Sequence, residues 1–296
     1  MTASAPFFRK MAGAIHAWNP DWALFAEIDP RGFHEGRGYP DELPPATVVA
    51  GHWYDITALA TATFNPEDHT DLLTGEQARN HWQLGRIYVR QLRLLKEAAA
   101  AMPQGAPVLV GEFGIPYNFD EGESYEAWAR GERGPHVWRK QIEALDLMYD
   151  AMDELLLSCA QWNYTVTNSN DPRIGDGWNQ EDLSIWSRDQ MDGRNDPDAG
   201  GRAIEGFCRP YVRRTQGRLL MMRFSRTSRM FRCVLMGNPS VRGPTEIYVP
   251  RIQYPNGFII ENMGAPSAIH VNTEQQLLGV QALMHGVSQL VLRPLE

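Results

Sequence analysis

A short apolar run that ends in a glycine and a glutamate constrains the fold of this chain more than any other feature. Residues 107–116 read PVLVGEFGIP. An apolar run between a proline and a glycine predicts a strand buried on both faces, as in a parallel sheet. Glutamate is rarely buried without a partner. Glu112 is therefore either a structural ion pair or loop carboxylate, or a catalytic group at the carboxyl end of a barrel strand.

The region before residue 210 alternates short apolar runs with amphipathic segments. The runs predict strands at residues 22–26, 46–50, 107–112 and 157–161. Helices are predicted at residues 6–19, with Trp18 on the apolar side, from a capping box at Thr74–Gln77 to Pro103, and at 136–156. Strands that alternate with amphipathic helices indicate parallel βα units.

Each predicted strand is followed by side chains that can do chemistry. In chain order these are Glu27, His52 with Tyr54, Glu112, and Trp162. The carboxyl ends of parallel barrel strands form one rim, so this coincidence favours an active site. Other readings stay open for single residues: His52 as a satisfied core histidine, Trp162 as a core residue, and Glu27 as a rim residue that forms a salt bridge.

A long polar loop follows the fourth strand. Residues 168–198 are rich in asparagine, aspartate and glycine and contain the run GDGWNQEDLSIW at 175–186. Loops of this length in compact domains are usually functional or disordered, and the two tryptophans argue against disorder. Trp178, Asn179 and Glu181 either reach a ligand or only fold the loop.

The hydrophobic pattern changes its period after a short predicted helix at 199–207. Alternating residues predict short strands at 222–225, 230–235, 245–250, 257–260, 276–280 and 289–294, separated by turn residues as in a β-sandwich. The segment from Arg209 to Arg242 carries many arginines and almost no acidic residue. This shift in charge predicts a domain boundary near residue 210.

Composition excludes some functions. The net charge of −8 and the lack of a basic stripe argue against a nucleic-acid partner. No apolar run approaches the roughly 20 residues that cross a bilayer. Cys159, Cys208 and Cys233 are odd in number and show no metal-ligand spacing, so we expect a reducing compartment such as the cytoplasm, and no metal.

Several motifs together resemble one enzyme family. The run GEFGIPYN at 111–118, the run QWNYT at 161–165 followed by the loop at 175–186, and the tail from Arg209 onward are similar to glycoside hydrolase family 5 of clan A. Within that family they resemble the branch of endoglycoceramidases and of glucosylceramide and steryl-glucoside β-glucosidases. The resemblance implies the second half of a (β/α)₈ TIM barrel, strands five to eight, in residues 1–209. It implies an antiparallel β-sandwich in residues 210–296.

The resemblance also implies roles for the residues at the strand ends. Glu112 would be the nucleophile of a retaining β-glycosidase, and Tyr54 would hydrogen-bond Glu112 and orient it. A retaining mechanism forms a glycosyl-enzyme and needs a second, protonated carboxyl about 5–5.5 Å away. Substrate-binding roles, without any cofactor, would fall to a further set of residues: His52, Trp162 as a sugar platform, Glu27, Asn163 and Trp178.

One part of the family pattern is missing from the sequence. The acid/base glutamate of the family follows an asparagine near the end of strand four, and no Asn-Glu pair precedes Glu27. A complete barrel needs roughly 200–250 residues, more than precede residue 210. Glu27 could serve as the acid, but its strand position matches a different family residue. We therefore expect a truncated chain, or one that pairs with a complementing N-terminal half-barrel. A secretory signal would then be lost with the missing half, so localisation stays open.

The expected substrate is a β-glucoside, and the branch points to a glycolipid such as glucosylceramide or a steryl glucoside. The expected reaction is hydrolysis of its O-glycosidic bond, with peripheral contact to membrane lipid. Two alternatives stay open: an endoglycoceramidase that releases the glycan from a glycosphingolipid, and a non-catalytic remnant that binds carbohydrate or lipid.

Overall fold

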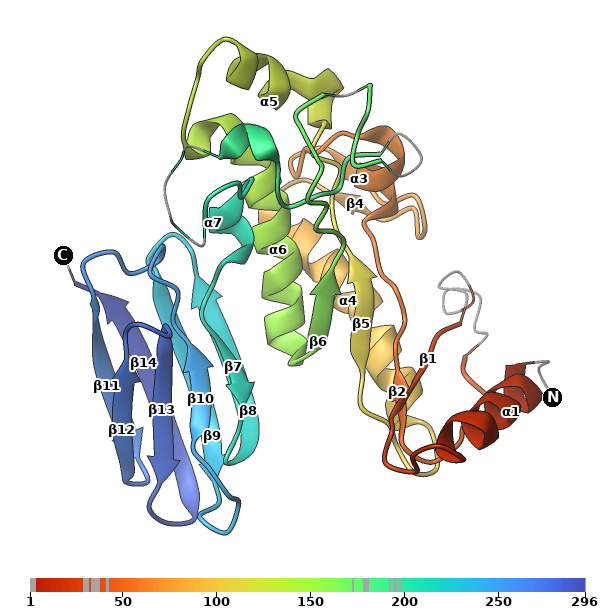
Figure 1. Cartoon of the computed structure of the whole chain (residues 1–296), viewed down its shortest axis with the longest axis vertical. Coiled ribbons are helices and arrows are strands. Elements are labelled where there is room, and N and C mark those ends of the chain that lie inside the picture. Colours follow the sequence, from red (N-terminus) through yellow and green to blue (C-terminus); the bar gives the residue numbers. More distant parts are fainter. Residues whose placement is uncertain are drawn as a thin grey trace. The chain divides into compact units, whose positions relative to one another are not determined.

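The structure is a computed structural model that describes residues 4–28, 32, 38–40, 43–171, 173–177, 181–191, 193, 196 and 198–295. Its internal contacts divide the chain into two compact units (Figure 1). The first unit comprises residues 1–126 and 157–191, and the second comprises residues 127–156 and 192–296. The strand ends that carry the predicted site residues all belong to the first unit.

Four strands of the first unit run parallel in the order of the sequence (Figure 1). They are β1 (Leu24–Ala26), β2 (Thr47–Val49), β5 (Leu109–Phe113) and β6 (Ser158–Gln161). Regular pairing joins β1 to β2 and β5 to β6. A parallel bridge between Val49 and Val108 joins the two pairs. The four predicted strands are therefore present, and their carboxyl ends point to one edge.

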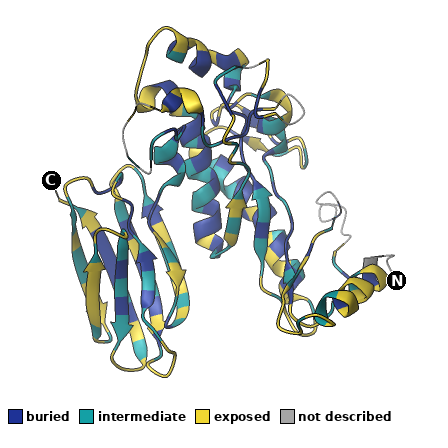
Figure 2. Ribbon diagram, viewed as in Figure 1, coloured by how far each residue is buried: buried dark blue, intermediate teal, exposed yellow. Residues whose placement is uncertain are grey.

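Helices and a small hairpin connect these strands. Their bounds are α1 (Ser4–His16), α3 (Ile56–Thr61), β3 (His69–Thr70), β4 (Gln77–Ala78), α4 (His81–Ala100) and α5 (Phe119–Ala129). The helix α4 buries one face, which includes Leu84, Tyr88, Leu92 and Leu95 (Figure 2). This is the apolar side that the sequence pattern predicts.

The predicted capping box at Thr74–Gln77 is wrong. The cap of α4 is Asn80, whose side chain accepts a hydrogen bond from the Gln83 amide at 2.9 Å. In return, the Gln83 side chain accepts one from the Arg79 amide at 2.7 Å. The Thr74 amide and hydroxyl instead donate to Asp71, which closes the turn between β3 and β4. A nearby carboxylate has thus recruited the threonine.

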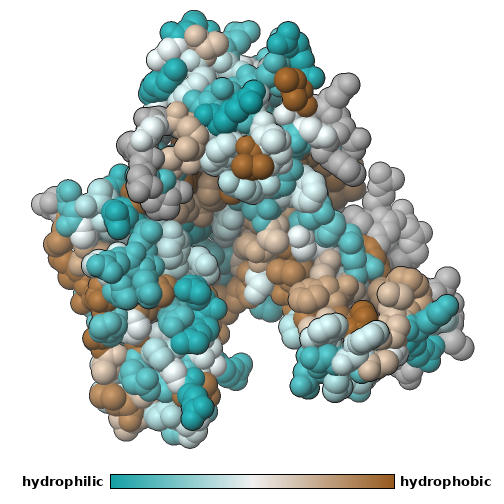
Figure 3. Space-filling view, viewed as in Figure 1, coloured by the Kyte–Doolittle hydropathy of each residue, from teal (hydrophilic) through white to brown (hydrophobic). Residues whose placement is uncertain are grey.

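Large apolar side chains remain exposed on α1 and around β1. The exposed set comprises Phe7, Met11, Trp18, Trp22 and Phe25, and hydrophobic atoms gather over these two elements in Figure 3. The prediction for Trp18 is wrong, because α1 ends at His16 and Trp18 is 86% exposed.

The second unit contains two four-stranded antiparallel sheets, and their strand orders are β12-β13-β10-β7 and β11-β14-β9-β8. The bounds are β7 (Tyr211–Arg214), β8 (Gly217–Ser225), β9 (Met230–Gly237), β10 (Thr245–Tyr248), β11 (Phe258–Gly264), β12 (Ser267–Asn272), β13 (Leu277–Ala282) and β14 (Gly286–Pro294). The unit also contains η1 (Pro135–Trp138), α6 (Arg139–Leu155) and α7 (Ile204–Phe207).

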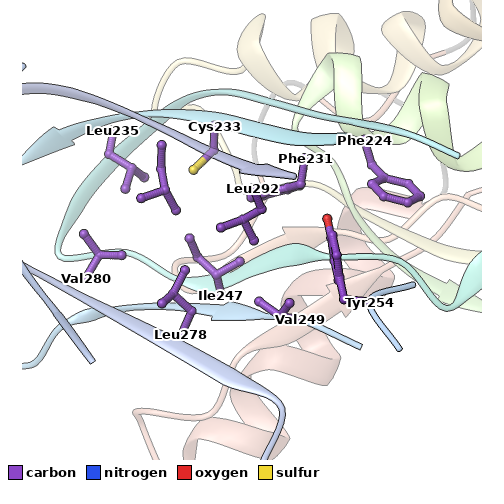
Figure 4. Close-up of a cluster of buried hydrophobic side chains, with 11 residues drawn as sticks. Phe224, Phe231, Cys233, Leu235, Ile247, Val249, Tyr254, Leu278, Val280 and Leu292 are labelled. Atoms are coloured by element: carbon purple, nitrogen blue, oxygen red, sulfur yellow. The ribbon is translucent and has the colours of Figure 1, made fainter. Parts of the chain in front are cut away.

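The two sheets contribute alternate residues to one hydrophobic core. Phe224, Phe231 and Leu292 come from the sheet that contains β8, β9 and β14, whereas Ile247 and Leu278 come from the other sheet (Figure 4). All five are almost fully buried. The period of two that the sequence shows after residue 210 thus places one face of each sheet in this core.

A buried arginine joins α6 to the chain just before β7. Arg209 is 3% exposed and donates to Asp150 at 2.6 Å and, over 3.4 Å, to Asp146. The Asp153 carboxylate lies 3.7 Å from the Arg209 Nε. Arg226 adds a second contact to Asp146 at 3.0 Å. Burial raises the pKa of Asp153 to about 7, although the Arg209 charge opposes this shift.

Candidate active site

The segment after β2 sends alternate side chains in two directions. Trp53 and Asp55 are buried, whereas His52 and Tyr54 are partly exposed. The Trp53 indole donates to the side chain of Gln91 on α4 at 2.9 Å. Asp55 accepts from the Ala58 amide at 3.0 Å and so caps α3. The buried pair therefore fixes the segment, and His52 and Tyr54 are left for the strand-end rim.

A buried polar network supports this segment from the helix side. The side chain of Gln91, which accepts from Trp53, also donates a hydrogen bond of 2.6 Å to Asp71. The Tyr88 hydroxyl donates to the second oxygen of Asp55. Asp55, Asp71, Tyr88 and Gln91 are each at most 5% exposed. Sequence reasoning missed this network, although the i, i+3 spacing of Tyr88 and Gln91 on one helix could have indicated a shared buried face.

Glu112 lies against the two outward residues of the β2 segment. The Tyr54 hydroxyl donates a hydrogen bond of 3.0 Å to the Glu112 Oε2. The His52 Nδ1 lies 3.4 Å from the same oxygen. Burial and the negative charge of Glu112 raise the pKa of Tyr54 well above its ordinary value. The phenol therefore stays protonated near neutral pH and acts as a donor to the carboxylate.

His52 also contacts the second carboxylate of the rim. Its Nδ1 lies 3.1 Å from the Glu27 Oε1, so one imidazole nitrogen faces both Glu27 and Glu112. Gly111 makes room for this ring, since a Cβ at that position would lie 3.1 Å from the His52 Cδ2. Three strand ends thus meet at one imidazole.

The end of β6 approaches the end of β5 closely. The Trp162 amide donates to the Phe113 carbonyl at 2.8 Å. A Cβ on Gly114 would lie 2.3 Å from the Trp162 carbonyl oxygen, so only glycine fits there. Trp162 itself is partly buried at the strand end, and the peptide bond that follows it is cis.

The side chain of Asn163 forms hydrogen bonds within the loop that follows β6. Its Nδ2 donates to Asp176 at 2.7 Å, and its Oδ1 accepts from the Thr165 hydroxyl at 3.0 Å. Asp176 also accepts from the Leu183 amide at 3.3 Å. Asp176 is a positioning residue that sequence reasoning missed. Asn163 therefore orders the loop after β6, and its role in substrate binding stays a prediction.

Three further residues of the loop after β6 are candidates for ligand contact: Trp178, Asn179 and Glu181. Trp178 and its neighbour Asn179 lie outside the described residues. Glu181 is exposed, and slight burial together with the Asp176 charge raises its pKa. The Glu181 charge also contributes to the raised pKa of Tyr54, which places this carboxylate in the electrostatic surroundings of the site.

The described residues therefore form a rim of parallel strand ends with an oriented carboxylate. They contain no group of three or more histidine, cysteine or acidic side chains that could hold a metal ion. No helix in the described part is long and apolar enough to cross a membrane. A carboxylate that accepts a tyrosine hydrogen bond at the carboxyl end of a parallel strand lies where βα-barrel enzymes place their active sites.

One family model matches the C-terminal part of the chain. Residues 209–288 match the model of the glycoside hydrolase family 5 C-terminal domain. This match confirms the resemblance to glycoside hydrolase family 5 that the sequence motifs predict.

Two relatives bear names that refer to glycolipids. A glucosylceramidase of Rhizopus delemar is 23% identical over 265 residues, which cover 82% of this chain and 37% of the relative. The crystal structure of sterylglucosidase 1 of Cryptococcus neoformans superposes with a TM-score of 0.80 and 24% identity, over 96% of this chain and 43% of that one.

A third relative is more distant in structure. Endo-glycoceramidase II from a Rhodococcus species superposes with a TM-score of 0.58 and 16% identity, over 99% of this chain and 54% of that one. The family has a TIM-barrel catalytic domain, in accord with the parallel strands of the first unit. The chain spans little more than a third of the curated glucosylceramidase and about half of the solved structures that it matches.

Proposed function

We propose that this chain carries the nucleophile side of a retaining β-glycosidase that acts on a glycolipid. The observation that carries the proposal is the hydrogen bond of 3.0 Å from Tyr54 to Glu112 at the carboxyl ends of parallel strands. A nucleophile must approach the anomeric carbon along one direction, and a fixed donor on one carboxylate oxygen leaves the other oxygen oriented for attack. Glu112 is the nucleophile, and Tyr54 orients it.

The remaining site residues have roles in this proposal. His52 and Glu27 form the wall beside the nucleophile, in accord with the His52 contacts to both carboxylates. Trp162 is the sugar platform, because a flat indole at a strand end suits the apolar face of a pyranose ring. Asn163 and Trp178 are the further substrate-binding residues. No cofactor takes part.

The strands β1, β2, β5 and β6 correspond to strands five to eight of a (β/α)₈ barrel. Two features support this: the parallel order of the four strands, and the edge of β1, where Phe25 is 62% exposed. The protonated carboxyl that assists the leaving group belongs to the complementing half-barrel. This chain alone therefore lacks the general acid.

The substrate that we propose is a β-glucoside of a lipid, such as glucosylceramide or a steryl glucoside, with peripheral contact between the enzyme and membrane lipid. The names of two relatives, a glucosylceramidase and a sterylglucosidase, support this class. The similarity in fold to an endo-glycoceramidase supports a second candidate, release of a whole glycan from a glycosphingolipid.

The experiment that tests the nucleophile uses an activated 2-deoxy-2-fluoro-β-glucoside with a dinitrophenolate leaving group. The Glu112 oxygen forms a bond to the anomeric carbon, the bond to the aryl oxygen breaks, and dinitrophenolate departs without needing a proton. Mass spectrometry should find one deoxyfluoroglucosyl group on the peptide that contains Glu112. The Glu112→Gln variant should remain unlabelled.

The same experiment separates the enzyme from a non-catalytic remnant. A remnant would bind the fluoroglucoside without forming a covalent adduct. Labelling of any other carboxylate, with Glu112 unmodified, would overturn the proposed role of Glu112. The corresponding 2-deoxy-2-fluoro-β-lactoside, with the same dinitrophenolate leaving group, shows whether the site accepts the longer glycan that an endoglycoceramidase requires.

A further inference from the structure

The outer face of the sheet β12-β13-β10-β7 contains a hollow of about 480 Å³. Its lining comes from three neighbouring strands and the adjacent turns. The residues are Pro244, Glu246, Ala268, Ile269, His270, Asn272, Gln275, Leu277, Gly279 and Gln281. All of them belong to the second unit, so the hollow shares no residue with the strand-end site of the first unit.

The strand register explains why the sheet is hollow at this point. Gly279 lies directly opposite Glu246 on one side and His270 on the other. Neighbouring strands are about 4.8 Å apart, so the carboxylate and the imidazole flank a gap of roughly two strand spacings with no side chain between them. A Cβ on Gly279 would lie 3.7 Å from the nearest atom, so a larger residue would fit at this position without a clash.

The polar groups around the hollow can bind a neutral ligand that is rich in hydroxyl groups. The charge of Glu246 is balanced by Arg214, which donates to it at 2.7 Å. The side chains of His270 and Gln281 make no hydrogen bond to any residue in the described part of the chain. Amide and imidazole groups can each donate and accept, which suits adjacent hydroxyls of a sugar.

An aromatic row continues this face on one side. Tyr248 on β10 pairs with Leu277 on β13, which lines the hollow, and with Tyr211 on the edge strand β7. The two tyrosine rings are 5.6 Å apart, and Tyr211 is 43% exposed. Exposed aromatic faces pack against the C–H faces of sugar rings.

We propose that this hollow binds one sugar ring of a neutral glycan, as a non-catalytic site on the second unit. Glu246 and His270 flank the ring, Gly279 forms the floor, and Gln281 contacts the hydroxyls. Such a site would retain a glycan-bearing substrate near the enzyme. It does not depend on Glu112.

The test is a titration of the isotopically labelled full chain with methyl β-D-glucoside, followed by NMR of the backbone amides and histidine rings. Saturable shifts are expected at Gly279, His270 and Gln281. Gly279→Val places a side chain in the hollow, and valine is readily accepted in β-strands. This variant should weaken binding of the glucoside by about tenfold or more, which corresponds to a loss of at least ~1.4 kcal/mol. Met236→Val, on the exposed side of β9, is the matched control and should bind normally.

His270→Ala gives a second measurement that does not alter the backbone, because the side chain is exposed and unpaired in the described residues. It should weaken binding without changing the melting temperature. Shifts that are absent, that lie only around Trp162, or that persist unchanged in both variants would overturn the proposal. Labelling of Glu112 by the fluoroglucoside should be unaffected by either variant, so failure here leaves the proposed nucleophile standing.

Discussion

At the scale of single residues, the site depends on a tyrosine that cannot easily lose its proton. Burial and the adjacent Glu112 charge raise the pKa of Tyr54, so its hydroxyl donates at any pH at which the carboxylate is ionised. A hydrogen bond to a charged group contributes roughly 1.5–3 kcal/mol. This hydrogen bond fixes one oxygen of Glu112, which is the basis of the orienting role that we propose for Tyr54.

Tyr54→Phe should slow the covalent labelling of Glu112 by about tenfold or more, because the carboxylate loses its orienting donor. The measurement is the rate of adduct formation by mass spectrometry, with an activated fluoroglucoside. The matched control is Tyr164→Phe, since Tyr164 is exposed and its ring lies 5.9 Å from the ring of Trp186. An unchanged rate in Tyr54→Phe would contradict the orienting role.

The buried network beneath the site makes a separate prediction about stability. Gln91→Leu removes the acceptor of the Trp53 indole and the donor to Asp71. Each buried group left without a partner costs about 1–3 kcal/mol, so the free energy of unfolding should fall by at least ~2 kcal/mol. Urea unfolding measures this, with Arg93→Leu on the exposed face of α4 as the control. A loss no larger than that of the control would show that the network adds nothing.

At the scale of elements, α6 is joined to the strands of its own unit through a charge cluster that responds to pH. The groups that face Asp153 are Arg209, Asp146 and Asp150, and Arg226 and Arg223 lie at its margin. The folded chain holds the Asp153 proton up to a pKa of about 7, whereas the ordinary value is 3.8. The stabilising contribution of this proton is therefore complete below pH 3.8 and is lost as the pH rises through 7.

Asp153→Asn should abolish this component, because an amide cannot ionise. The unfolding free energy of the native chain, minus that of the variant, is expected to decrease as the pH rises from acid to above 7. Denaturant unfolding at several pH values measures the difference. Glu154→Gln, an exposed change on the same helix, should show no such trend. A difference that stays constant across this range would refute the role of Asp153.

Local patterns predict some elements of this chain well and others poorly. The parallel strands and α4 follow from apolar runs and helical periodicity, since burial determines both. The strand β12 was missed because it is a sheet edge whose residues are mostly exposed, so no alternation marks it. The false cap at Thr74 arose because its partner, Asp71, is set by the turn that the chain makes and not by spacing alone.

The candidate site shows the same limit. The shared orientation of His52 and Tyr54 follows from the period of two in an extended segment. The contact between His52 and Glu27 joins residues of different strands, and only the sheet register brings them together. Asn163 carries the groups of a sugar-binding residue, and both its side-chain nitrogen and its side-chain oxygen also hydrogen-bond within the loop. Sequence identifies which groups are available, whereas tertiary contacts decide which of them remain free.

At the scale of the whole molecule, the proposal predicts little catalysis by this chain alone. Purified chain should hydrolyse an aryl β-glucoside with an ordinary leaving group poorly or not at all, because general acid catalysis typically contributes 10²–10⁴-fold. The measurement is release of the aryl alcohol over time. Clear turnover by the 296-residue chain that is lost in Glu112→Gln would refute the assignment of the acid to another segment.

The contact between Gly114 and the Trp162 carbonyl has a consequence for any survey of substitutions in this chain. A Cβ at residue 114 would lie 2.3 Å from the Trp162 carbonyl oxygen, so a larger residue would force apart two strand ends that carry Glu112 and Asn163. In a deep mutational scan, Gly114 should tolerate as few replacements as a reacting group, although it has no side chain to react. A ranking of residues by their tolerance to substitution would therefore place Gly114 beside the catalytic residues, although its role is only steric.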